Sequence, residues 1–202
     1  MFDWRRAGSW CGLAGSSIFL MAWAIAIATT PGYDFGGQWV SDLGVGAGAS
    51  FFNAGAIMAG MLSIPFAVTL AIVLRPSRLG IAGSMSLALA GVFLMGVGIF
   101  TENAGETHWI VSISFFSLMV ISMTLLSYPL FHSATIGPWT GQFTATIVLI
   151  GIGFVSLYGM GPLAETVAVL LIAIWSLAIA WKLRWYLCVV FPQGAFGGHS
   201  GR

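Results

Sequence analysis

Long apolar runs separated by short polar segments are the dominant pattern of this chain. Six runs of about 20 residues contain almost no charged side chain, and about 20 apolar residues in a helix cross the hydrocarbon core of a bilayer. We expect transmembrane helices at about 9–29, 53–74, 80–100, 109–131, 141–160 and 164–185. Strands of a membrane barrel would alternate in hydrophobicity over about ten residues, and these runs do not. The pattern therefore predicts an all-α, polytopic membrane protein.

Composition and glycine content agree with that fold class. Hydrophobic residues make up 58% of the chain and charged residues 6%, whereas about a quarter of the residues in a soluble domain are charged. The 27 glycines are predicted to let helices pack closely, with Gly8 and Gly12 forming a GxxxG pair. We expect one six-helix transmembrane domain over residues 1–190 and a flexible, glycine-rich tail over 191–202.

The charges divide between the two sides of the predicted bundle. With six crossings, all seven Lys and Arg residues fall on one side and five of the six acids on the other. An excess of basic residues marks the cytoplasmic side, so the N and C termini are predicted to be cytoplasmic and the protein to be a multi-pass protein of the cell membrane. The first span lacks a small-residue cleavage site and is expected to stay as an anchor. The acids expected outside are Asp34, Asp42, Glu102, Glu106 and Glu165.

Polar side chains that can do chemistry gather in the predicted outer loops. The loop at about 31–51 is long, and loops of this length are uncommon unless they fold back or serve a function. The next outer loop holds Glu102 and His108, and Ser112 shares a helix face with His108 because it follows one turn later. We predict a polar extracytoplasmic pocket formed by Ser41, Asp42, Asn53, Glu102, His108 and Ser112.

Several short motifs lie near the outward ends of the spans. They are S-D-L-G at 41–44, F-N at 52–53, G-I-F at 98–100 followed by Glu102, and His108 followed by F-F at 115–116. As a set they resemble the DUF998 family of six-helix integral membrane proteins, over nearly the whole chain. The family is similar in layout to the Frag1/DRAM/Sfk1 group, whose members are linked to lipid handling. Such proteins often carry Glu-Arg near the last turn, where this chain has Glu165-Thr166, so no ion pair is implied there.

The predicted pocket has two interpretations. Ionisable groups at membrane depth usually face a bundle interior or a water-filled cavity, so the pocket could bind a headgroup, a cation or a substrate. The same side chains could instead form a hydrogen-bond network that pins the outer loops to the helix ends. We expect a non-catalytic accessory subunit or a lipid-binding bundle, with membrane lipids or other membrane protein subunits as partners. The chain has no nucleic-acid or cofactor motif.

Two other function classes remain open. A lipid-modifying enzyme of the outer leaflet would use His108 as proton carrier, oriented by an acid, and Ser41 or Ser112 as nucleophile. No metal is expected, and if one were bound its ligands would be Asp42, Glu102 and His108. A small-molecule transporter is the third alternative, although no charge lies in the middle of a span.

Overall fold

The chain folds into a helical bundle. The computed structural model describes residues 4–134 and 136–190, so the predicted tail at 191–202 lies outside the described residues. The long helices are α1 (Trp4–Ala28), α2 (Ala49–Val73), α3 (Arg78–Ile99), α4 (Glu106–Phe131), α5 (Pro138–Tyr158) and α6 (Pro162–Val190). Two short 3₁₀ helices, η1 (Val40–Gly44) and η2 (Glu102–Ala104), lie in connecting loops, and the described residues contain no strand.

All six long helices are long and apolar enough to cross a membrane. The all-α fold and the six predicted spans are therefore confirmed, and the chain is a multi-pass membrane protein. All six helices begin a few residues before the predicted runs, as α2 does by starting at Ala49. A helix satisfies its own backbone hydrogen bonds, so it can continue into the polar interface on either side of the hydrocarbon core.

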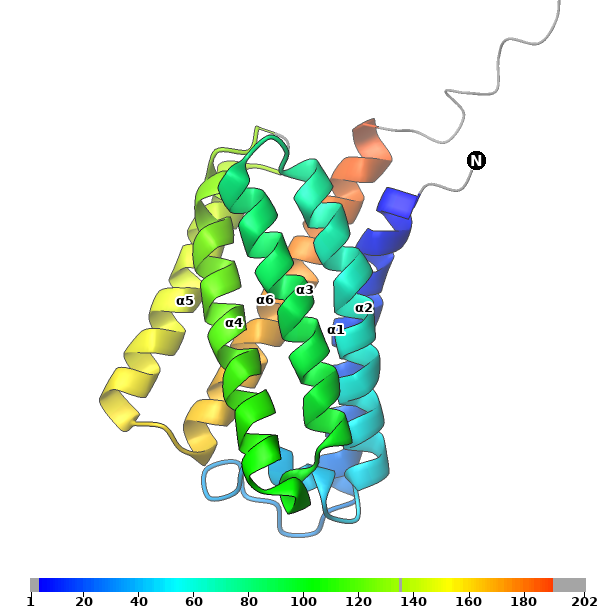
Figure 1. Ribbon diagram of the computed structural model, residues 1–202, viewed down its shortest axis with the longest axis vertical. Helices are drawn as coiled ribbons and strands as arrows, with labels where there is room; N and C mark the ends of the chain where they lie inside the picture. The colour runs from blue at the N-terminus through cyan, green and yellow to red at the C-terminus, as the bar shows by residue number, and fades with distance from the viewer. Residues whose placement is uncertain (1–3, 135, 191–202) are drawn as a thin grey trace, which may run out of the picture.

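The helices pack as a ring in chain order. Each helix contacts the next one, and α6 returns to contact α1 (Figure 1). The ring has a basic end, with Arg6, Arg75, Arg78, Lys182 and Arg184. The opposite, acidic end has Asp34, Asp42, Glu102, Glu106 and Glu165. This separation is the one expected from the sequence, and the cytoplasmic location of the basic end stays a prediction.

Glycines bring neighbouring helices close together. A Cβ atom added to Gly60 of α2 would lie 2.5 Å from the backbone oxygen of Gly91 in α3. In α1, both Gly8 and Gly12 face α2, and a Cβ atom at Gly12 would lie 2.7 Å from Cδ2 of Phe66. Small residues of this kind allow the close packing of helices that stabilises bundles in lipid.

Helix α5 is packed along the half nearest the basic end. Its buried residues are Thr140, Gly141, Thr144 and Ile147. The indole Nε1 of the fully buried Trp175 in α6 donates a hydrogen bond to Thr144 Oγ1 at 2.9 Å. Toward the acidic end α5 diverges from α4 (Figure 1), and the side chains of Leu157 and Tyr158 are 81% and 70% exposed. The half of α5 nearest the acidic end is therefore packed less closely against its neighbours.

Candidate functional site

The short helix η1 covers the acidic end of the bundle. It contacts α1, α2, α6 and η2. Val40 and Leu43 are 1% and 0% exposed and belong to a cluster that includes Trp23 of α1 and Phe52 of α2. Burying two large apolar side chains stabilises the loop by about 3–6 kcal/mol, which holds the polar residues between them in fixed positions.

Three carboxyl groups gather where η1 meets η2 and α6. Ser41 Oγ donates a hydrogen bond to Glu102 Oε1 at 3.2 Å. The backbone N–H of Val40 donates to Glu165 Oε2 at 2.6 Å, and that of Trp39 donates to Asp42 Oδ2 at 2.8 Å. We call Asp42, Glu102 and Glu165 the carboxyl cluster.

The carboxyl cluster has no Lys or Arg near it among the described residues. Every Lys and Arg of residues 4–134 and 136–190 lies at the basic end. Burial, followed by hydrogen bonding and repulsion from the adjacent Asp42, raises the pKa of the Glu102 carboxyl to about 7. Burial also raises the pKa of Tyr33 to about 12, with the negative charge of Glu165 adding to the effect. The site therefore carries negative charge that no described cationic side chain balances.

His108 and Ser112 form a second polar unit on α4. Nδ1 of His108 lies 2.6 Å from the backbone oxygen of Phe100, and Nε2 lies 3.2 Å from Ser112 Oγ. A carbonyl oxygen can only accept, so Nδ1 donates to Phe100, and Nε2 can accept from Ser112 when it carries no hydrogen. His108 and Ser112 therefore lie on one face of α4, as the sequence predicted. The side chain of His108 is 8% exposed.

A lateral groove of about 860 Å³ connects these polar units with the membrane flank of the bundle. Most of its lining residues belong to α4, α5 and α6, and α5 is the helix that diverges from α4 toward the acidic end (Figure 1). Its acidic end is lined by Trp39, Ser41, Glu102, His108, Trp109, Ser112 and Glu165. Farther along, the lining is mainly apolar, with Phe116, Met123, Ile147, Val148 and Leu171.

The family of the chain follows from a direct comparison. Residues 13–182 match the family described as "Protein of unknown function (DUF998)". The chain belongs to the DUF998 family. No curated protein and no solved structure matches it, and the similarity of layout between DUF998 proteins and the Frag1/DRAM/Sfk1 group stays a prediction.

In this DUF998 protein the S-D-L-G and F-N motifs hold η1 in place. Asn53 Nδ2 donates a hydrogen bond to the backbone oxygen of Gly44 at 2.9 Å. A Cβ atom at Gly44 would lie 2.8 Å from Asn53 Oδ1, so glycine permits this approach. Asn53 is therefore an anchor of the loop, and it is not among the residues that line the groove. Asp42 also stands outside that lining.

Glu165 belongs to the site, although it is not one of the predicted pocket residues. The available signal in the sequence was its position near the start of the sixth span, where it is the only acid of α6. At Thr166, where the sequence implied no ion pair, Oγ1 donates to the backbone oxygen of Phe35 at 3.3 Å. This DUF998 chain therefore has a neutral contact there.

The described residues offer no group of three or more His, Cys, Asp or Glu side chains that could hold a metal ion. The sequence predicted no metal, and it predicted Asp42, Glu102 and His108 as the ligands if one were bound. His108 faces the Phe100 carbonyl and Ser112, whereas Asp42 faces the Trp39 N–H. The geometry of this part of the chain thus gives no support to a metal centre built from these three residues.

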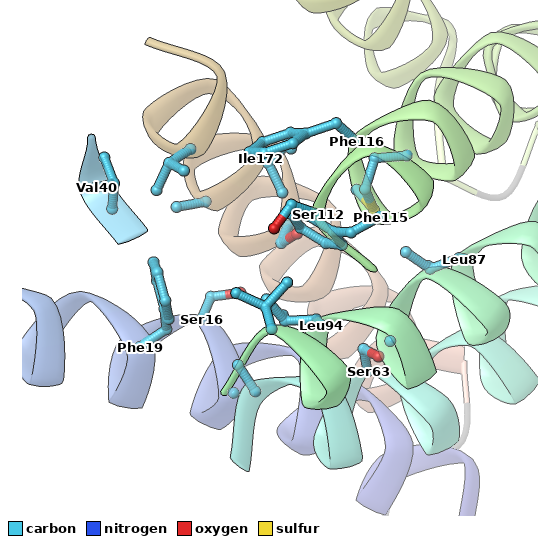
Figure 2. Close-up of a pocket in the computed structure, with 18 of the residues that line it drawn as sticks. Ser16, Phe19, Val40, Ser63, Leu87, Leu94, Ser112, Phe115, Phe116 and Ile172 are labelled. Atoms are coloured by element: carbon cyan, nitrogen blue, oxygen red, sulfur yellow. The ribbon is translucent and has the colours of Figure 1, made fainter. Parts of the chain in front are cut away.

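A smaller cavity of about 100 Å³ lies inside the ring (Figure 2). It is lined by residues of α1, α2, α3, α4 and α6, and Val40 and Ser41 of η1 line it as well. Ser41, Ser112, Phe116, Met119, Glu165 and Ile172 line both this cavity and the lateral groove. A thin layer of side chains therefore separates the interior of the bundle from the groove.

Proposed function

We propose that the protein is a non-catalytic, lipid-binding membrane protein that holds one membrane lipid in the lateral groove. The acyl chain lies between α4, α5 and α6, and the headgroup lies at the acidic end. The observation that carries this proposal is the groove itself, which runs from an apolar flank to a polar end. Its volume of about 860 Å³ falls in the range of about 300–1,000 Å³ typical of small-molecule sites.

The position of the groove explains why a lipid is the expected ligand. A water-soluble molecule would have to leave water to reach residues such as Met123 and Ile147, which line the groove deep in α4 and α5. An acyl chain is already in that environment and loses no hydration on entering. Polar groups at one end of the groove then fix the position of the headgroup. A role as an accessory subunit for other membrane proteins stays a prediction.

Two substitutions on α5 test this function. Gly151 lines the groove, whereas Gly153 does not, and a Cβ atom at Gly153 meets no other atom within 4 Å. Native mass spectrometry of gently extracted protein should show a lipid adduct in the wild type. Gly151→Trp should lose the adduct because the indole fills the groove, and Gly153→Trp should keep it. Loss in neither variant, or an equal loss in both, would contradict the proposal.

A second candidate function rests on the contact between Ser112 and His108. Ser112 Oγ can give its proton to Nε2 while Nδ1 is held by the Phe100 carbonyl, which is the arrangement of a nucleophile and its base. A lipid-modifying enzyme would use this pair inside the groove. The backbone N–H of Ser112 is already bonded within α4, so stabilisation of an oxyanion would need other donors.

A serine-reactive fluorophosphonate distinguishes the two candidates. Labelling of wild-type protein that disappears in Ser112→Ala and persists in Ser114→Ala would favour the enzyme, because Ser114 lies on the same helix but lines neither cavity. We expect no labelling at Ser112, since the binding function needs no activated nucleophile.

A further inference from the structure

We propose that the lipid held in the groove has an ammonium-bearing headgroup whose positive charge lies against Glu102 and Glu165. This inference rests on the proposed lipid-binding function and adds the chemical class of the ligand. It depends on three observations: the placement of the two carboxyl groups, the distribution of charge over the bundle, and the aromatic side chains beside them.

The two carboxyl groups come from different elements and line the same end of the groove. Glu102 belongs to η2 and Glu165 to α6. One oxygen of Glu102 accepts from Ser41, and one oxygen of Glu165 accepts from the Val40 N–H. These bonds fix the orientation of each group. A carboxylate offers about four lone-pair sites, so each retains capacity to accept hydrogen bonds from an ammonium group.

The negative groups around the groove favour a headgroup that carries a positive charge. Asp42 adds a third carboxyl behind the groove, and all Lys and Arg of the described residues lie at the opposite end of the bundle. An anionic headgroup would meet repulsion from each of these groups, whereas an ammonium group supplies the missing counter-charge. At a partly buried site this interaction is screened less than at an open surface.

Aromatic rings complete the same end of the groove. Trp39 and Trp109 both line it, and their side chains are 42% and 64% exposed. The backbone N–H of Trp39 is held by Asp42. The face of an indole ring attracts cations, so the two tryptophans suit an ammonium headgroup beside the carboxyl groups.

Binding of a cation at this site should depend on pH. The titratable groups that act on Glu102 are Asp42 on η1 and Glu165 on α6. His108 on α4 lines the same end of the groove. Tyr33, in the loop before η1, is close to Glu165, Asp42 and Asp34. The pKa of Glu102 is about 7, so its ionised fraction falls about tenfold from pH 8 to pH 6. The affinity for an ammonium-bearing headgroup should fall in the same direction, by up to about tenfold, because the protonated carboxyl gives no charge attraction.

The test compares lipids that differ only in headgroup. Native mass spectrometry of the full chain, titrated with phosphatidylethanolamine, phosphatidylglycerol and diacylglycerol of identical acyl chains, measures the three affinities. We expect phosphatidylethanolamine to bind most tightly, and more tightly at pH 8 than at pH 6. Glu102→Gln should weaken its binding by about fivefold and flatten the pH dependence. The control Glu106→Gln removes the same charge from an exposed residue outside the groove and should change neither.

Each outcome decides one of the two proposals. Equal affinity for all three lipids, or tighter binding of phosphatidylglycerol or diacylglycerol, would overturn the headgroup assignment while leaving the groove as a lipid site. Absence of any lipid adduct, or an adduct that survives Gly151→Trp, would refute the proposed function itself. If Glu102→Gln does not fold, the pH titration of the wild-type protein decides, because a pH-independent preference is incompatible with a role for Glu102.

Discussion

At the scale of single residues, the chemistry of the acidic end depends on how the loop residues are held. Ser41 and Asp42 lie between the buried Val40 and Leu43, so one short helix both fills an apolar gap and positions two polar side chains. Glu102 is placed by its bond to Ser41. Its raised pKa follows from partial burial beside another carboxyl.

The raised pKa of Glu102 predicts that stability depends on pH. A carboxyl whose pKa is about 7 in the folded protein and about 4.3 when unfolded binds its proton more tightly when folded. The folded state is therefore favoured at low pH and loses this contribution as the pH rises from about 4 to about 7. We expect a higher unfolding temperature at pH 5 than at pH 8, measured by intrinsic tryptophan fluorescence. Glu102→Gln should reduce the difference and Glu106→Gln should retain it. An undiminished difference in Glu102→Gln would refute this origin.

At the scale of helices, the packing of α2 against α3 depends on glycine. Backbone atoms of α3 lie where a side chain at Gly60 would be, with Gly91 O at 2.5 Å and Met95 N at 2.9 Å from the position of a Cβ atom. Backbone atoms cannot rotate away as a side-chain end can. The two helices would therefore have to move apart to admit one methyl group.

We expect Gly60→Ala to lower the free energy of unfolding by about 1–3 kcal/mol, as overpacking does elsewhere. The matched control is Gly153→Ala in α5, where an added Cβ meets open space. That variant should be neutral or slightly more stable, since alanine favours the helix over glycine by up to about 1 kcal/mol. Denaturant titration in detergent micelles measures both. Equal stabilities of the two variants would show that the close approach of α2 and α3 contributes little.

At the scale of the whole molecule, charge distribution predicts the orientation in the membrane. Ala47 is exposed at the acidic end and Ala134 is exposed at the basic end. In a background lacking Cys11 and Cys188, a membrane-impermeant maleimide should label Ala47→Cys on intact cells. Ala134→Cys should react only after permeabilisation, because basic loops remain cytoplasmic. The reverse pattern would invert the assignment and place the groove's polar end in the inner leaflet.

The sequence alone determined the elements of this protein. Apolar runs near 20 residues specify spanning helices because lipid cannot hydrogen-bond a bare backbone, and the six predicted spans match α1 to α6. The pairing of His108 with Ser112 was also predictable, since both lie on one helix at a fixed spacing. Local rules of this kind need no knowledge of how the helices pack.

The tertiary structure decided which residues meet and where the bundle opens. Glu165 lies beside Val40, although 125 positions separate them in the chain. The divergence of α5 creates the groove, and no feature of the apolar run at 141–160 predicted this divergence. The physical reason is that helix faces packed against protein and faces exposed to lipid are both apolar. Hydrophobicity therefore shows that a segment spans the membrane, while the fit between neighbouring helices determines which faces pack and which remain open.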